Sequence, residues 1–135
     1  MRLKRMIGCT PAALAFVAPM MAVTHTAGAA DVESTAQARG ALVYSKYCVL
    51  CHGESGKGDG RAASMQKARP ADLTASRKSE SYRLQIVRNG GAAMNRSGSM
   101  PAWSDVLSPE QIADVVRYLE VVASKRDRAQ AGARQ

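Results

Sequence analysis

The sequence predicts an all-α domain in which long loops connect about three main helices. Along three segments, apolar residues recur at steps of three and four, which is the period of an α-helix. No segment alternates apolar and polar residues as a half-buried strand does. Two glycine-rich loops, near 53–78 and 90–107, separate the helical segments. Loops of this length in a small domain usually carry a function, and these two are expected to wrap a large bound group.

Residues 1–30 are predicted to be a secretory signal that is absent from the mature protein. Basic residues within 2–5 precede a mostly apolar stretch at 13–23, and small residues follow it. This order is typical of a cleaved signal. We expect cleavage after Ala29 or Ala30 and export to the periplasm.

Two other interpretations of this N-terminal segment fit less well. The apolar stretch is short and interrupted by prolines at Pro11 and Pro19, so it is a poor membrane anchor. A lipid on Cys9 would require an apolar region before the cysteine, and here that region follows it. We therefore expect no membrane span in the mature protein.

The mature chain is predicted to be one domain at 31–123 with a polar tail at 124–135 that frays. Without the three basic residues of the signal, 16 of the 19 basic residues remain against 11 acidic ones, a net charge of about +5. No basic helix is interleaved with aromatic residues, so nucleic acid is not an expected partner. After residue 30 the aromatic residues are one tryptophan and four tyrosines, and a bound group is expected to complete the small core.

The first two helices are predicted from periodicity and from a stop signal. Near 35–49, and just beyond, five residues recur on one helical face: Gly40, Tyr44, Tyr47, Cys48 and Cys51. The second helix is expected from about 79 to 89, with Gly90-Gly91 as its end.

The last helix has the clearest start. Ser108 is a good N-cap, Pro109 occupies the first helical position, and Gln111 completes a capping box. The residues expected to form its buried stripe are Ile112, Val115, Val116, Leu119 and Val122.

The sequence "CVLCHGESGKGDG" at 48–60 contains the spacing Cys-x-x-Cys-His, which is the attachment signature of c-type haem. Each thiol adds to one vinyl group of the porphyrin, so Cys48 and Cys51 are expected to tether one haem c covalently. The imidazole Nε2 of His52, the next residue, is expected to be the proximal iron ligand.

Other uses of two cysteines fit this sequence less well. A disulfide between near neighbours closes almost no loop and stabilises little. A thioredoxin-like redox pair needs strand–helix–strand surroundings, and a zinc site needs a fourth ligand. The mature chain has no further Cys or His to supply one.

The sequence resembles a class I monohaem c-type cytochrome of the bacterial periplasmic kind over roughly residues 36–122. The resemblance implies an all-α cytochrome c fold around one haem, with a sixth iron ligand supplied late in the chain. The matching motifs are "CVLCHG" at 48–53, "GKGDG" at 56–60, "RPADL" at 69–73, "SMPAW" at 99–103 and "LSPEQIADVVRYL" at 107–119.

The sixth ligand is expected to be a methionine thioether, which is a soft ligand suited to haem iron. The mature chain offers Met65, Met94 and Met100. Met65 has no supporting context, whereas Met94 and Met100 share the second loop. Pro101 fixes the geometry after Met100, and the resemblance also implies Met100; Met94 remains the alternative.

The resemblance assigns roles to four further positions. It implies that the carbonyl of Pro70 accepts a hydrogen bond from His52, which would orient the imidazole. It implies that the first and last helices cross at Gly40 and Tyr118. For Trp103, an indole hydrogen bond to a haem propionate and a plain packing role are both open.

These predictions indicate a periplasmic one-electron carrier rather than an enzyme, because His and Met on both faces of the iron leave no position for a substrate. We expect a monomer that takes electrons from a quinol-oxidising complex or a dehydrogenase and passes them to an oxidase or reductase. Two alternatives are a haem-based small-gas sensor and a fixed subunit of a larger redox complex.

The basic residues of the segments around the expected haem have two interpretations. They form either an ordinary solvated surface or a ring that steers an acidic partner to the haem edge. They are Lys46, Lys57, Lys67, Arg69, Arg77, Lys78, Arg83, Arg88 and Arg96.

Overall fold

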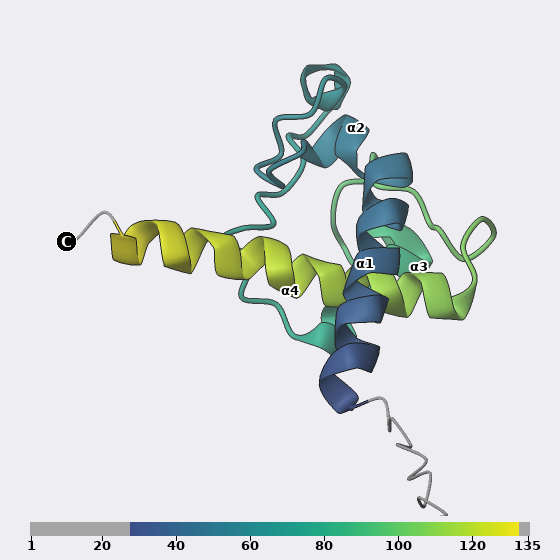
Figure 1. The fold of residues 1–135 in the computed structure, drawn as a ribbon. Coiled ribbons are helices and arrows are strands. Elements are labelled where there is room, and N and C mark those ends of the chain that lie inside the picture. The colour runs from purple at the N-terminus through teal and green to yellow at the C-terminus, as the bar shows by residue number, and fades with distance from the viewer. Residues whose placement is uncertain (1–27, 133–135) are drawn as a thin grey trace, which may run out of the picture.

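The computed structural model describes residues 28–132, and this part of the chain contains helices and loops but no strand. The all-α prediction is confirmed (Figure 1). The elements in chain order are α1 (Ala29–Tyr47), α2 (Val49–His52), the 3-10 turn η1 (Ala63–Met65), α3 (Glu80–Ala93) and α4 (Pro109–Gly132).

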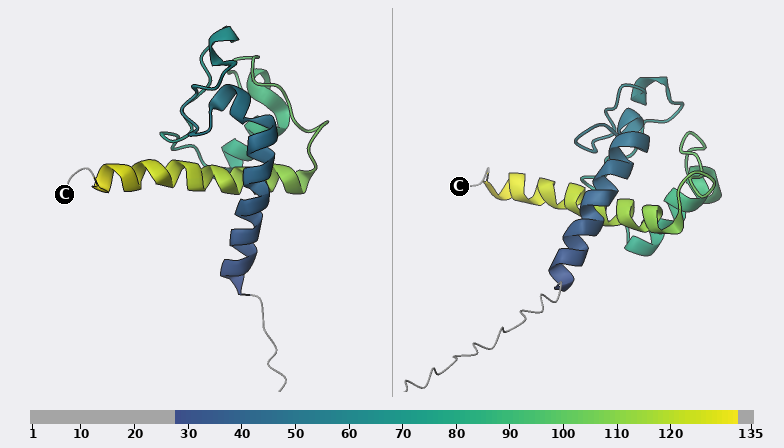
Figure 2. Two further views of the ribbon diagram at one scale, coloured as in Figure 1. Left: turned by 45° about the horizontal axis from the view of Figure 1, so that its top comes forward. Right: turned by 45° about the vertical axis from the view of Figure 1, so that its right-hand side comes forward.

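Helices α1 and α4 cross each other, and the loops and α3 gather on one side of the crossing (Figures 1 and 2). The close approach requires Gly40, because a Cβ there would collide with the backbone carbonyl of Asp114 and lie 2.9 Å from the Cβ of Tyr118. The rings of Tyr44 and Tyr118 pack beside this point with their centroids 5.4 Å apart. The crossing at Gly40 and Tyr118 is therefore confirmed.

Charged residues fasten the same crossing. The Asp114 carboxylate is 2% exposed and accepts two hydrogen bonds from Arg39, at 2.6 and 3.0 Å. Arg117 lies 3.6 Å from the same carboxylate and also pairs with Glu33 of α1. Because a buried carboxylate is costly without partners, this network fixes which faces of α1 and α4 meet.

Helix α4 begins as predicted. The Ser108 backbone N–H donates to Gln111 Oε1 at 2.9 Å, and the Gln111 N–H donates to Ser108 Oγ at 3.2 Å, which is a complete capping box. All five residues of the predicted stripe are buried. The helix continues to Gly132, so residues from 124 onward extend α4 where the sequence predicted a frayed tail.

Helix α3 starts at a Ser79 cap, whose Oγ accepts from the Tyr82 N–H. The predicted stop is a kink: Gly90 has φ 79° and ψ 170°, and a short helical continuation follows to Ala93. This backbone conformation favours glycine.

The first predicted helix is divided in the structure. Cys48 has φ −111°, and it separates α1 from the one-turn α2. Helix α1 also starts earlier than predicted, at Ala29. The predicted signal, including Cys9, lies mostly outside the described residues and stays a prediction. No helix within residues 28–132 is both long enough and apolar enough to cross a membrane.

The core lies along α4, which packs against both α1 and α3 beside the loops. Its buried members come from α1, α3 and α4 and from Leu107, which precedes α4. Side chains of the two long loops pack against it from the other side: Leu73, Met100 and Trp103. The loops are thereby held over one face of the helical core, where they enclose the candidate site.

Candidate functional site

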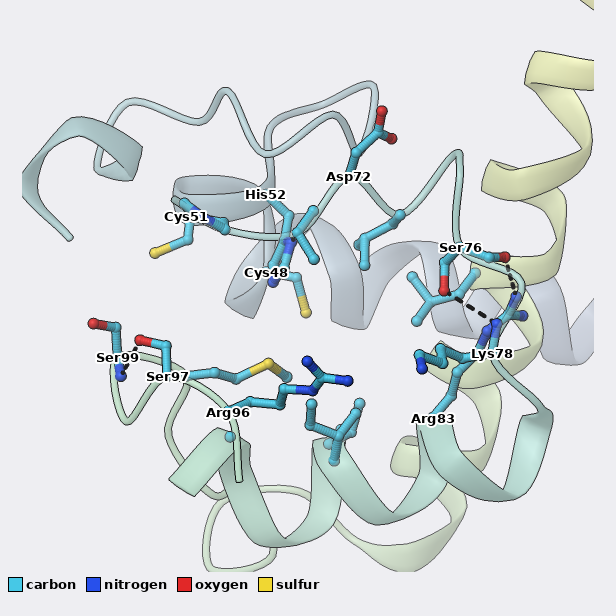
Figure 3. A pocket seen from close by; sticks show the side chains of 18 of the residues that line it. Cys48, Cys51, His52, Asp72, Ser76, Lys78, Arg83, Arg96, Ser97 and Ser99 are labelled. Atoms are coloured by element: carbon cyan, nitrogen blue, oxygen red, sulfur yellow. Dashed lines mark hydrogen bonds between the residues drawn. The ribbon is translucent and has the colours of Figure 1, made fainter. Parts of the chain in front are cut away.

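A cavity of about 620 Å³ opens between the two long loops, α2 and α3 (Figure 3). Its volume lies in the range of small-molecule and cofactor pockets. In Figure 3, Cys48, Cys51 and His52 occupy one wall, and Ser97 and Ser99 of the second loop lie across the cavity from them.

Both cysteines of the motif line the cavity as free thiols. Cys48 ends α1 and Cys51 lies within α2, so one helical turn presents the two thiols and the following imidazole together. Burial, and to a lesser degree the neighbouring Cys51, raises the pKa of Cys48 to about 12.

The His52 imidazole also lines the cavity and is oriented by one backbone group. Its Nδ1 lies 3.2 Å from the carbonyl oxygen of Ala71. A carbonyl only accepts, so Nδ1 carries the hydrogen and Nε2 keeps its lone pair. Burial lowers the pKa of His52, and the bond to Ala71 acts in the opposite direction. The neutral imidazole with a free Nε2 is the form that binds metal.

The acceptor for His52 corrects one prediction. The sequence resemblance implied the carbonyl of Pro70, and the structure uses that of Ala71, one residue later. The Pro70 carbonyl is directed at Gly58, where a Cβ would collide with it. The predicted hydrogen bond from His52 to the Pro70 carbonyl is therefore wrong. Pro70 does line the cavity, as expected of a residue of the site.

Tyr44 fixes the loop that follows His52, and the sequence prediction did not assign it this role. Its hydroxyl donates to the Gly53 carbonyl at 2.7 Å, and the Tyr44 side chain is buried. Burial raises the Tyr44 pKa, so the hydroxyl stays a donor. The loop then returns, and the Gly58 N–H donates to the His52 carbonyl at 2.9 Å. The carbonyl of His52 and the carbonyl of Gly53, the next residue, are therefore both held by hydrogen bonds.

Among the candidate thioethers, Met100 lines the cavity, whereas Met94 and Met65 do not. Met94 is the C-cap of α3, and Met65 is 79% exposed. The Met100 carbonyl accepts from the Gly91 N–H at 2.9 Å, and a Cβ at Gly90 would lie 3.0 Å from the same carbonyl. The kink at the end of α3 thus positions the Met100 loop.

The comparison with protein families agrees with this geometry. Residues 35–119 match the family model described as "Cytochrome C oxidase, cbb3-type, subunit III". The chain belongs to this family of c-type cytochromes.

Two relatives show what else the cytochrome resembles. It is 32% identical over 100 residues to the cbb3-type cytochrome c oxidase subunit FixP of Azorhizobium caulinodans. That alignment covers 74% of this chain and 32% of FixP, so the cytochrome spans about one third of that relative's length. In structure it resembles a chain of the Kuenenia stuttgartiensis reducing HAO-like protein complex, with a TM-score of 0.57 and 25% identity. The match covers 65% of this chain and 44% of that one.

The residues of the cavity fit the haem that this family implies. Two thiols and an imidazole come from one turn, a thioether comes from the second loop, and much of the remaining wall is apolar. Trp103 belongs to this apolar wall, and its ring meets that of Tyr47 edge-on with the centroids 5.4 Å apart. Its hydrogen bond to a haem propionate stays a prediction.

The cytochrome also places basic side chains around the cavity that were predicted only as a possible ring. Five of the nine line it: Arg69, Arg77, Lys78, Arg83 and Arg96. Lys67 lines a second, more open hollow beside Met65. Lys46, Lys57 and Arg88 line neither. The nine residues therefore do not all line one cavity, and no feature of the sequence separates those that do from those that do not.

Proposed function

We propose that this cytochrome transfers single electrons through one haem c, bound covalently by Cys48 and Cys51, with His52 and Met100 as the axial ligands. The observation that carries the proposal is the shared cavity: both thiols, the imidazole and the thioether line one space of about 620 Å³. When bound, the haem iron would supply the change between the ferric and ferrous states.

The protein side of this function is to hold the ligands in place. Tyr44 and the Ala71 carbonyl hold the segment and the ring of His52, and the bond to Gly91 holds the backbone of Met100. A thioether ligand favours the ferrous state and raises the potential. With His52 and Met100 both engaged, no position is left for a substrate, which supports electron transfer and not catalysis.

Covalent attachment is tested with protein produced alongside haem-attachment machinery. After acid–acetone extraction, the colour is expected to stay with the polypeptide, because thioethers survive the solvent. Cys48→Ala and Cys51→Ala should each impair maturation by removing one thioether. Colour that leaves with the solvent in the unsubstituted protein would refute the proposal.

We also propose that the cytochrome works in the periplasm. The support is the predicted signal at 1–30, which lies mostly outside the described residues. Its donor would be a quinol-oxidising complex or a dehydrogenase, and its acceptor an oxidase or reductase. Fractionation of cells that produce the full chain tests this location: haem protein confined to the cytoplasm contradicts it.

A second candidate is a fixed subunit of a larger redox complex. It is favoured by the relatives, because FixP is named as an oxidase subunit and the structural neighbour belongs to a named complex. Native purification separates the two candidates. A free carrier elutes as a haem-containing monomer, whereas a subunit elutes with partner proteins and dissociates only in denaturant.

A further inference from the structure

A second hollow adjoins the cavity between η1 and the second long loop. Its volume is about 480 Å³, and six residues line it: Met65, Gln66, Lys67, Ser97, Gly98 and Ser99. Gln66, Ser97 and Ser99 also line the larger cavity, so the two spaces share a boundary. The Met65 side chain is 79% exposed. At this hollow, the surface of the protein therefore comes close to the group that the cavity would hold.

The hollow lies at the end of the cavity that contains Cys51. Gln66 links the two, because the nitrogen of its side-chain amide is 3.9 Å from the Cys51 Sγ. In Figure 3, Ser97 and Ser99 lie across the cavity from Cys51, at the same end of it. Arg83 lies at the other end. A haem bound through Cys51 would therefore present its thioether edge to the hollow.

Two large apolar side chains are exposed in the elements that form this end of the molecule. Met65 lines the hollow, and Leu50 of α2 is 52% exposed. Elements α2 and η1 contact each other, and the Leu50 carbonyl accepts a hydrogen bond from the Ala62 N–H at 2.9 Å. Single exposed apolar residues are ordinary, but apolar side chains that gather in one place mark a surface for a partner.

The charge around the hollow is positive. Lys67 lines it, and Arg61, which is exposed, lies just before η1. Among the side chains that the structure describes, neither Arg61 nor Lys67 forms an ion pair, and no acid lines the hollow. Asp59, an acid of the same loop, is turned toward Gly53, where a Cβ would collide with its carboxylate. The surface that complements this one is therefore acidic.

We propose that the hollow beside Met65 docks a redox protein whose contact face is apolar at its centre and acidic at its rim. One electron passes there between the haem and the redox centre of that partner, and no bond or proton changes place. The inference rests on the proposed electron transfer and deepens it, since it selects one surface and the kind of partner. An apolar centre with few ion pairs suits a brief contact, and the basic rim steers the approach.

The test uses two small one-electron oxidants of opposite charge, anionic hexacyanoferrate(III) and cationic tris(phenanthroline)cobalt(III). Stopped-flow absorbance follows the oxidation of the reduced holo-protein by each. Met65→Glu places a negative charge at the hollow. The matched control is Val106→Glu, because Val106 is also apolar and 57% exposed but lines neither the hollow nor the cavity.

For Met65→Glu we expect oxidation by the anion to slow about three- to ten-fold at an ionic strength of about 10 mM, where screening is weak. Oxidation by the cation should speed up. A change of potential or of folding would move both rates in the same direction, so opposite changes report the place of electron transfer. Lys67→Gln should give the same pattern with smaller changes, and Val106→Glu should leave both rates close to those of the unsubstituted protein.

The apolar centre is tested separately with Met65→Ser, which removes the thioether and adds no charge. With an acidic blue-copper protein as the oxidant, its rate should fall several-fold, while its rate with hexacyanoferrate(III) stays unchanged. An unchanged rate with the copper protein overturns the apolar contact.

Two failures are distinguishable. Haem that extracts from the unsubstituted protein, or that is not oxidised by either reagent, contradicts the proposed electron transfer itself. Covalent, redox-active haem with the same pair of rates in Met65→Glu and Val106→Glu overturns the docking surface alone. If Met65→Glu yields no holo-protein, Lys67→Glu is measured in its place, and unchanged rates in that variant overturn the surface.

Discussion

The two candidate iron ligands, His52 and Met100, are held by backbone groups. His52 is oriented by the Ala71 carbonyl, and the Met100 backbone is fastened to Gly91. Backbone partners do not depend on side-chain rotamers, so the His52 ring and the Met100 backbone are each held in place beside the cavity. A backbone group cannot be removed by substitution, so the axial ligands are tested by substituting the ligand residues themselves.

Met100→Ala tests the axial ligand and separates an electron carrier from a gas sensor. Loss of a soft ligand that favours ferrous iron should lower the potential, remove the red-edge Met–Fe absorption band, and allow the reduced protein to bind carbon monoxide. Spectra and potentiometry of Met100→Ala measure all three. Met94→Ala is the control and should change none of them, because Met94 does not line the cavity.

If Met94→Ala removes the band instead, Met94 is the ligand. If the unsubstituted protein already binds carbon monoxide readily at neutral pH, its iron is not held by Met100, and the sensor becomes the better proposal.

Tyr44→Phe tests the hydrogen bond that holds the loop after His52. The substitution removes the donor to Gly53 and leaves that carbonyl without its 2.7 Å partner in a buried place. The expected loss is about 1–2 kcal/mol of unfolding free energy, measured by denaturant titration of the holo-protein. Tyr82→Phe is the control, since the Tyr82 hydroxyl bonds to Arg96 at the surface, and it should be close to neutral. Equal losses of unfolding free energy in the two variants would show that the Tyr44 hydrogen bond stabilises the protein no more than the surface bond of Tyr82.

At the scale of elements, the fold depends on one crossing and one kink. The crossing of α1 and α4 brings Gly40 against Asp114, and the kink at Gly90 brings the second loop over the cavity. Both use glycine because backbone from another segment occupies the place of a Cβ. The crossing at Gly40 sets how α1 and α4 pack, and the kink at Gly90 sets where the Met100 loop lies relative to them.

Gly40→Ala should therefore be severe. The new Cβ would meet the Asp114 carbonyl, which belongs to a helix backbone and cannot move aside alone. We expect a loss of ~3 kcal/mol of unfolding free energy or failure to fold. Gly98→Ala is the matched control, because its Cβ would have its nearest neighbour at 3.9 Å. Thermal unfolding followed by circular dichroism checks both, and a native-like Gly40→Ala protein would contradict the crossing.

At the scale of the whole molecule, the described core is small for the chain. Its buried apolar members lie mainly along α4 and one face of α1, and the cavity takes the space between the loops. A domain of this size buries little surface on folding and often needs a bound group for stability.

The chain without haem should accordingly be largely unfolded, because a group that binds only the folded state supplies its binding free energy to folding. Circular dichroism of protein made without the attachment machinery should show little helix, whereas holo-protein made with it should be helical and unfold cooperatively. A fully helical apo-protein would show that the helices form a sufficient core alone.

The sequence by itself determined the features that depend on near neighbours. Capping of α4 at Ser108, its buried stripe, the all-α class and the Cys48-x-x-Cys51-His52 motif are local patterns, since each involves residues within a few turns. The division at Cys48 and the continuation of α4 past residue 124 to Gly132 were not predicted.

Only the tertiary structure decided which distant groups meet. It placed the Ala71 carbonyl, and not that of Pro70, beside His52 Nδ1. It also brought Met100 rather than Met94 to the cavity, through a kink whose partner lies in another segment. Among the basic residues, it separated those at the cavity from those elsewhere. The physical reason is common to all three: these contacts join residues far apart in the chain, and packing, not local propensity, selects them.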